Sequence, residues 1–232
     1  MNTINIDTFD FFRELSHNNN RDWFAANKHR WNAIHDDFVA FTDALLNVMR
    51  AHAPSLQNAS ADKCVYRIYR DVRFSPDKSP YKRHIACFLP SGGLKRCGVP
   101  GYYLQLGMDS NGLPAGCSLG GGIFMPSPAA LAAIRQEIFY NIEEFLSVVH
   151  NPHYMKYFDD SFFTVKKLSR VPKGYPADWP YGQYLKYKDY TSMCVWPEES
   201  AFENDFFDRV VDAFRATLPL NMFVQKAMYD LL

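Results

Sequence analysis

The spacing of short apolar runs in the middle of the chain constrains the fold more than any other feature. Four runs, at residues 65–74, 81–89, 101–108 and 116–124, are separated by turn-forming residues, a pattern that predicts β-strands. A parallel strand pair needs a crossover of about a dozen residues or more, usually a helix, and these connections are too short to hold one. We therefore expect a mainly antiparallel sheet, with a further strand at 190–196.

Helical patterns precede this sheet. Asp7 or Thr8 can cap a short helix that runs to Leu15, and Asn19 or Asn20 can cap a long second helix. Apolar residues recur in that second segment mostly at three- and four-residue steps, which predicts one buried stripe. The stripe consists of Phe24, Trp31, Ile34, Phe38, Phe41, Leu45 and Val48.

Two more helices are expected after the sheet. Ser127 and Pro128 suit the cap and first position of a helix that continues to about residue 150, and a last helix is predicted from about Glu198 to Thr217. A chain of 232 residues can bury one full core. We expect a single α+β domain over 1–232, with helices flanking the sheet. It comprises a helical part at about 7–52, the sheet at about 64–124, a helix at about 127–150 and a mixed C-terminal part with the final helix.

The overall composition disfavours several classes of protein. Lys plus Arg and Asp plus Glu are equal at 25 each, whereas proteins that coat DNA usually have a basic domain. Residues 1–7 have no basic start, so no signal peptide is expected, and no apolar run approaches the ~20 residues that span a bilayer. The 5 cysteines are widely spaced, as is typical of reduced thiols. We therefore expect a cytoplasmic protein with no membrane partner.

The segment from Arg67 to His84 concentrates positive charge in this otherwise neutral chain. Six cations share it with two acids: Arg67, Arg70, Arg73, Lys78, Lys82 and Arg83, against Asp71 and Asp77. Crowded cations repel one another unless an anion lies among them. The segment is therefore either a site for an anionic ligand or an internal ion network.

The first interpretation assigns roles to these residues. The candidate anion-binding residues are Arg67, Arg70, Arg73, Lys78 and Lys82, because guanidinium groups bind phosphate or carboxylate with two prongs and lysines add mobile charges. The candidate catalytic residues are His84, Asp71 and Asp77. Asp71 would orient the arginines, and His84 is the best acid–base group. Strand alternation would place Arg67, Asp71 and Arg73 on one face, and Lys82 and His84 on the face of Ala86 and Phe88.

Two alternatives stay open. In one, Asp71 and Asp77 are themselves the anions, and the segment is a structural Arg/Asp network without a catalytic role. In the other, the protein is a nucleic-acid-binding module, a hypothesis that the neutral total charge makes less favoured. Aromatic residues that could stack on single-stranded bases alternate with the cations: Tyr66, Tyr69, Phe74 and Tyr81.

Weaker patterns point to no further site. His150, His153, Asp159 and Asp160 do not have the spacing of standard metal ligands, so no metal site is expected. The run Gly120–Gly122 lacks the Gly-Lys-Ser/Thr of a phosphate loop and favours a bulge or a close approach of two backbones. The residues leave open the cofactor, the reaction and the oligomeric state.

The basic segment resembles a known family signature. Its pattern R-x-x-R-D-x-R-F-S-x-D-K-x-P-Y-K-x-H is similar to that of domain-of-unknown-function family 2461, and residues 19–28 are similar to that family's N-N-x-x-W-F-x-x-N-K motif. Further matches are Gly101-Tyr102-Tyr103, Gly120–Gly122, Arg135, Pro172-Lys173-Gly174 and Leu185–Lys188. The resemblance covers nearly the whole chain. It implies a shared fold and a cytoplasmic setting, and it implies no established activity.

These observations lead to one working hypothesis. We expect a basic pocket that binds a small anionic ligand. A more specific form of this hypothesis is an enzyme that acts on a phosphorylated or carboxylated small molecule. The residues do not decide whether the protein is an enzyme.

Overall fold

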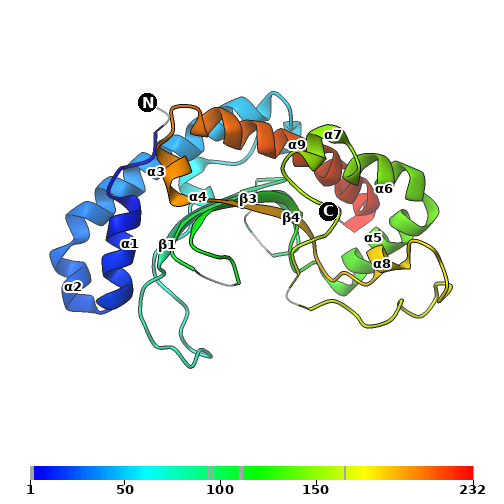
Figure 1. The fold of residues 1–232 in the computed structure, drawn as a ribbon, viewed down its shortest axis with the longest axis horizontal. Coiled ribbons are helices and arrows are strands. Elements are labelled where there is room, and N and C mark those ends of the chain that lie inside the picture. Colours follow the sequence, from blue (N-terminus) through cyan, green and yellow to red (C-terminus); the bar gives the residue numbers. More distant parts are fainter. Residues whose placement is uncertain (1–2, 94, 96, 110–111, 165, 232) are drawn as a thin grey trace.

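A four-stranded antiparallel sheet forms the centre of the computed structural model, which describes residues 3–93, 95, 97–109, 112–164 and 166–231. The strand order is β1-β2-β3-β4. The strands are β1 (His84–Pro90), β2 (Pro100–Gly107), β3 (Gly116–Ile123) and β4 (Tyr190–Trp196). Helices flank the sheet, so the predicted α+β class is confirmed (Figure 1).

Two long helices cover one face of the sheet. They are α3 (Lys28–Arg50) and α9 (Phe206–Ala227), and both cross above the strands (Figure 1). Gly121 lets α9 come close, because a Cβ atom there would lie 2.3 Å from Oγ1 of Thr217. The expected close approach of two backbones is found at Gly120, where a Cβ atom would lie 1.8 Å from the Ser192 carbonyl oxygen of β4.

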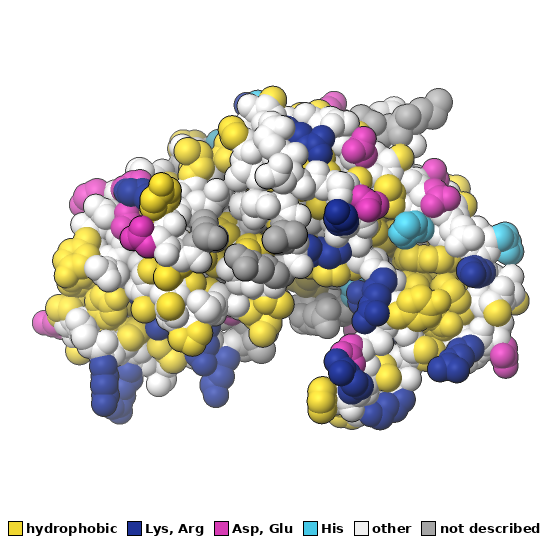
Figure 2. Space-filling model, turned by 180° about the vertical axis from the view of Figure 1, so that it is seen from behind, with side chains coloured by type: hydrophobic (Ala, Val, Ile, Leu, Met, Phe, Trp, Pro, Cys, Tyr) yellow, Lys and Arg dark blue, Asp and Glu magenta, His cyan; other side chains and the backbone are white. Residues whose placement is uncertain are grey.

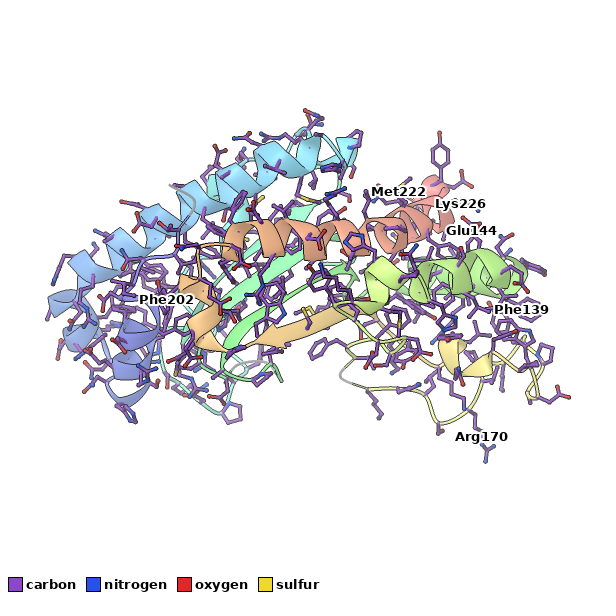
Figure 3. The ribbon with its side chains drawn as sticks, turned by 45° about the horizontal axis from the view of Figure 1, so that its top comes forward. Phe139, Glu144, Arg170, Phe202, Met222 and Lys226 are labelled. Atoms are coloured by element: carbon purple, nitrogen blue, oxygen red, sulfur yellow. The ribbon has the colours of Figure 1, made fainter. Side chains whose placement is uncertain are left out.

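Shorter helices extend the molecule at both ends of the sheet (Figure 1). At one end lie α1 (Thr8–His17) and α2 (Arg21–Ala26), with α4 (Ala61–Cys64) next to the sheet. At the other lie α5 (Pro128–Tyr140), α6 (Ile142–Val149), α7 (Pro152–Met155) and α8 (Gly182–Leu185). Lys226 of α9 pairs with Glu144 of α6 at 2.7 Å and joins the second group to the long helix (Figure 3). Short 3₁₀ helices at Pro54–Leu56, Glu198–Phe202 and Tyr229–Leu231 complete the described elements.

The predicted strand at 65–74 is wrong. This segment makes only isolated bridges, at Val65 to Cys87 and at Tyr69 to Tyr81, and its return strand begins at His84 rather than Tyr81. Like charges that lie directly opposite each other on two paired strands destabilise the sheet. If residues 65–74 and 81–89 had formed two regular paired strands, their cations would lie opposite one another. Residues 65–83 instead form a loop, called here the basic loop, that hangs below the sheet (Figure 1).

Three predicted helices have different bounds. The long second helix is divided into α2 and α3 at Asn27, and the helix expected at 127–150 is divided into α5 and α6 at Asn141. The last helix begins only at Phe206, after a 3₁₀ turn, and continues through Pro219 to Ala227. Buried Leu220, Phe223 and Val224 beyond that proline anchor the added turns in the core.

Several smaller expectations can be compared with the structure. Of the predicted stripe, Val48 is exposed, whereas the other six members are buried. The sequence also predicts a short strand at 162–166, where the structure has only a bridge from Phe163 to Thr191 and Val165 lies outside the described residues. It predicts a turn at residues 111–112, of which Asn111 lies outside the described residues as well. All cysteines are free thiols. No helix among the described residues has the length and apolar character needed to cross a bilayer.

Candidate anion-binding site

The base of the basic loop is fixed by backbone pairing. The Arg70 N–H donates to the Pro80 carbonyl at 2.9 Å, and the Lys82 N–H donates to the Ile68 carbonyl at 2.8 Å. Tyr81 is buried between them, with its ring stacked on Phe24 of α2 at a centroid distance of 4.1 Å. The Tyr66 N–H also donates to the Ala86 carbonyl at 2.9 Å, so the loop is attached both to β1 and to the N-terminal helices.

A cleft lies between this loop, the start of β1 and the end of α1. Its volume is about 530 Å³. It is lined by Ser16, Asn19, Arg70, Asp71, Ser75, Asp77, Ser79, Tyr81, Lys82, Arg83 and His84. A second hollow of about 660 Å³ shares Asn19, Arg70 and Tyr81 with the cleft and adds Arg21 and Lys78. Five cations and two carboxylates line the two hollows, which is a net charge of +3.

The two acids of the loop each hold one arginine. Asp77 pairs with Arg70 and also accepts hydrogen bonds from the N–H (2.9 Å) and hydroxyl (2.6 Å) of Ser79. These Ser79 bonds, followed by Arg70, lower the pKa of Asp77 below its usual range. Asp71 pairs with Arg73 at 2.7 Å, and that hydrogen bond lowers the pKa of Asp71 to about 2. Both acids are therefore ionised near neutral pH, which suits orienting an arginine better than transferring a proton.

Neither ion pair is buried. The Arg73 and Asp71 side chains are 76% and 50% exposed, and Asp77 is 61% exposed beside a better covered Arg70. Exposed pairs contribute about 0–1 kcal/mol. The Arg/Asp pairing of the structural alternative is therefore present, but in an exposed form that adds little stability.

Lys82 differs from the other cations of the loop. Its Nζ atom donates to the Arg67 carbonyl at 2.7 Å and lies 5.1 Å from the centre of the Tyr66 ring. Among the described residues, no carboxylate pairs with it. Burial, and then the nearby charges of Lys95 and Arg67, lower the pKa of Lys82 to about 8. Lys82 is thus a partly buried amine surrounded by cations.

Lys95 is the functional candidate that the sequence did not indicate. Its Nζ atom lies 4.2 Å from the centre of the same Tyr66 ring and donates to the Val65 carbonyl at 2.8 Å. Burial lowers the pKa of Lys95 as well. Lys95 lies in the turn after β1, outside the basic segment. Its position and neighbours in the sequence give no sign that it contacts that segment.

His84 forms the inner wall of the cleft. It is only 5% exposed, and its Nδ1 atom is buried without a hydrogen-bond partner among the described residues. Burial, followed by the charges of Lys82 and Arg83, lowers the pKa of His84 to about 4. Gly107 lies opposite in the ladder, where a Cβ atom would come within 2.9 Å of the His84 Cβ, so the absence of a side chain permits the close approach of the two strands at His84.

The sheet face beyond His84 is polar. Strand alternation places Gln105 of β2 and Ser118 of β3 on the same face, away from α9, as a directly paired couple. Both side chains are buried, and Gln105 Nε2 and Ser118 Oγ have no partner among the described residues. Gln105 Oε1 accepts a hydrogen bond from the Tyr103 hydroxyl at 2.8 Å. Unpartnered buried groups are costly, so this region is poised to bond water or a ligand.

The structure brings only some of the predicted site residues together. Arg70, Lys82, His84, Asp71 and Asp77 line the cleft. Lys78 lines the adjoining hollow and donates to the Val72 carbonyl at 2.9 Å. Arg67 and Arg73 are exposed and do not line either hollow, although the Arg67 carbonyl holds Lys82. The predicted row of Arg67, Asp71 and Arg73 on one strand face is wrong, because no strand forms there.

Comparison with known proteins identifies the family of this chain. The family described as conserved hypothetical protein (DUF2461) matches residues 7–223 of the 232. The chain belongs to this family. No curated protein and no solved structure matches it. Membership therefore supports the resemblance of the basic segment and adds no activity to it.

A metal centre has no support in the described part of the chain. No three or more His, Cys, Asp or Glu side chains lie close enough there to hold an ion. His153 and Lys156 instead bond Asp212 of α9, at 3.0 and 2.8 Å, which attaches α7 to α9.

Proposed function

We propose that the cleft beside the basic loop binds a small anion that carries a phosphate or carboxylate group. The observation that carries this proposal is the environment of Lys82. A charged amine that is partly removed from water and surrounded by cations is costly unless an anion joins it. A phosphate or carboxylate in the cleft would supply the missing negative charge.

Arg70 and Arg83 are placed to share that ligand. Both line the cleft with Lys82, and each has an acidic partner that leaves further guanidinium N–H groups to donate. The neutral side chains around them add hydrogen bonds without adding negative charge: Ser16, Asn19, Ser75 and Ser79. An arginine fork with a nearby lysine is a common way to hold an oxyanion.

His84 would give the site its capacity for chemistry. With a pKa of about 4 it is a weak base that is neutral near pH 7, and its buried Nδ1 atom, which has no partner among the described residues, can hydrogen-bond a polar group of a bound molecule. An enzyme acting on a phosphorylated or carboxylated small molecule is accordingly the more specific form of this proposal.

Binding of defined anions tests the proposal. Isothermal titration calorimetry and thermal unfolding would be measured with inorganic phosphate, a sugar phosphate and a dicarboxylate. A ligand at a hundred times its Kd stabilises a protein by about 2.7 kcal/mol, and for a chain of this size the melting temperature would rise by roughly 5–10 °C.

Two lysine variants make that test specific. Lys82→Met should weaken binding by about tenfold to a hundredfold, the usual value of one charge-assisted hydrogen bond. Lys63→Met, at an exposed lysine of α4 outside both hollows, should bind like the unaltered protein. If no anion shifts the melting temperature, or if both variants bind equally well, the cleft is not the anion site.

A nucleic-acid-binding module is the second candidate, because aromatic side chains stand free on the basic loop. Phe74 is 94% exposed and Tyr69 is 53% exposed. Lys and Arg side chains gather along the lower edge of the molecule on both sides of a notch (Figure 2), and Arg170 points away from the molecule on the segment opposite the basic loop (Figure 3). Binding to single-stranded RNA that weakens steeply with salt would favour this candidate, whereas salt-independent binding or none would remove it.

A further inference from the structure

We propose that Lys82 is a nucleophile that forms an imine with the carbonyl group of an anionic ligand. This inference rests on the proposed anion site and specifies its ligand as an aldehyde or ketone that also carries a phosphate or carboxylate. Two lysines, Lys82 and Lys95, contact one aromatic ring, that of Tyr66, and anion binding alone does not explain this pairing.

Lys82 and Lys95 approach the same Tyr66 ring, at 5.1 and 4.2 Å from its centre. They reach it from different segments, the end of the basic loop and the turn after β1. Each amine is held by a backbone carbonyl, that of Arg67 for Lys82 and that of Val65 for Lys95. Within the described ranges neither has a carboxylate partner, so the position of each amine is fixed without any compensation of its charge.

This arrangement favours an uncharged amine at Lys82. A lysine that is desolvated beside another cation is the usual form of an activated amine nucleophile. The pKa of Lys82, about 8, agrees with the geometry, because burial is the larger cause of the shift and Lys95 the next. Near neutral pH an appreciable fraction of Lys82 is therefore the free base that attacks carbonyl carbon.

Lys82 is also accessible to a ligand. It lines the cleft together with Arg70 and Arg83, which can hold the anionic group, while the groups that contact its amine, Arg67 and Tyr66, lie outside that lining. His84 lies two residues further along the chain on the same wall. A cavity of about 530 Å³ accommodates a small phosphorylated aldehyde.

The reaction balances without an oxidant or a metal. The lone pair of Lys82 Nζ forms a bond to the carbonyl carbon, and the π electrons of the C=O bond move to oxygen. The two hydrogens of the amine leave with that oxygen as one water molecule, which leaves a C=N bond. The neutral imidazole of His84 lines the same cleft, and its unpartnered Nδ1 atom can hydrogen-bond the reacting group.

Pyridoxal 5′-phosphate, an anionic aldehyde, is the probe for this reaction. The protein would be treated with it at neutral pH, reduced with sodium borohydride to fix any imine as a secondary amine, and mapped by peptide mass spectrometry. Because burial and then Lys95 lower the pKa of Lys82 to about 8, Lys82 holds much more free base near neutral pH than an ordinary lysine, so it should be labelled at least about tenfold faster than exposed Lys63. Inorganic phosphate should slow the labelling of Lys82 and leave that of Lys63 unchanged.

Three variants separate this inference from the proposed function. Lys82→Arg keeps the charge but cannot form an imine, so it should still bind phosphate while labelling at the cleft disappears. Lys95→Met removes the neighbouring cation and should slow the labelling of Lys82 without abolishing it, because burial is the larger cause of its lowered pKa. Lys63→Arg serves as the matched control and should leave the labelling of Lys82 unchanged.

Each result has a distinct meaning. If phosphate binds at Lys82 but Lys82 is labelled no faster than Lys63, the imine inference is wrong and the anion site remains. If phosphate neither binds nor protects, the proposed function fails, and the inference fails with it.

Discussion

Asn19 and Tyr81 exchange two hydrogen bonds through their backbone and amide groups. The Asn19 side-chain amide donates to the Tyr81 carbonyl at 3.0 Å, and the Tyr81 N–H donates to Asn19 Oδ1 at 3.1 Å. The Asn19 side chain thereby satisfies both backbone groups of Tyr81, as a neighbouring β-strand would. This contact joins the two sequence motifs of the family, which lie far apart in the chain, at one wall of the cleft.

We expect Asn19→Ala to destabilise the protein by about 1–3 kcal/mol, because it leaves a partly buried N–H and carbonyl without partners. The free energy of unfolding from urea titration measures this loss. Asn47→Ala removes an exposed asparagine of α3 and should change stability by less than about 0.5 kcal/mol. A stability of Asn19→Ala equal to that of Asn47→Ala would show that the loop is not held through this side chain.

Removal of Lys82 should stabilise the protein. The pKa of Lys82 in the folded state, about 8, is below the ordinary value for lysine, so folding opposes its protonation. Its charge therefore destabilises the native state below pH 8, and this penalty disappears as pH rises toward 10.5. We expect Lys82→Met to raise the free energy of unfolding at pH 7 by about 1–3 kcal/mol.

Urea unfolding at pH 7 of Lys82→Met and of Lys63→Met provides the comparison. Lys82 has no carboxylate partner among the described residues, so its removal breaks no ion pair, and a Lys82→Met protein less stable than Lys63→Met would contradict this prediction. A stabilised variant that binds phosphate more weakly is the combination expected of a residue retained for function rather than folding.

Local patterns were sufficient to predict much of the fold. The α1 helix, the antiparallel arrangement of β1 to β3 and the strand at Tyr190–Trp196 follow from periodicity and turn residues, which act over short stretches of chain. The end of α9 was not predictable in this way. Pro219 is a helix-breaking residue in isolation, and only the packing of Leu220 and Phe223 against the core overcomes it.

The candidate site was predictable in its location but not in its composition. A cluster of cations is visible in the sequence, whereas the direction of each side chain depends on whether the backbone forms a strand. Because residues 65–83 form a loop, Arg67 and Arg73 turn outward and Arg70 and Lys82 turn toward the cleft. Lys95 and the polar couple of Gln105 and Ser118 reach the region only through tertiary contacts, which spacing does not encode.

Stability should depend on pH through His84. Its pKa is lowered to about 4 in the folded state from an ordinary value of 6.5, so the unfolded chain binds more protons between these values. The free energy of unfolding therefore has its full contribution from neutral His84 above pH 6.5. This contribution, up to about 3 kcal/mol, is lost as the pH falls from 6.5 toward 4.

The measurement is the free energy of unfolding across this range for the unaltered protein and for His84→Gln. The charged groups that share the cleft with His84, namely Arg70, Asp71, Asp77, Lys82 and Arg83, are present in both proteins. Their contributions cancel in the difference between the two curves, and the difference should slope between pH 4 and 6.5. A flat difference would mean that His84 titrates normally.

Arg70 and Arg73 provide the sharpest test of which cations bind the ligand. Each pairs with one aspartate of the basic loop, but only Arg70 lines the cleft, while Arg73 is 76% exposed and lies 5.8 Å from the centre of the exposed Phe74 ring. We expect Arg70→Ala to weaken phosphate binding by about tenfold or more and Arg73→Ala to leave the Kd unchanged. Calorimetric titration of both variants measures the difference, and each variant serves as the control for the other, since both remove one arginine from one ion pair of the same loop.

Equal losses of affinity would mean that the ligand responds to the total charge of the loop, as a polyanion would, rather than to a defined pocket. Loss of affinity in Arg73→Ala alone would place the ligand at the outer tip of the loop, beside Phe74, and would favour the nucleic-acid candidate.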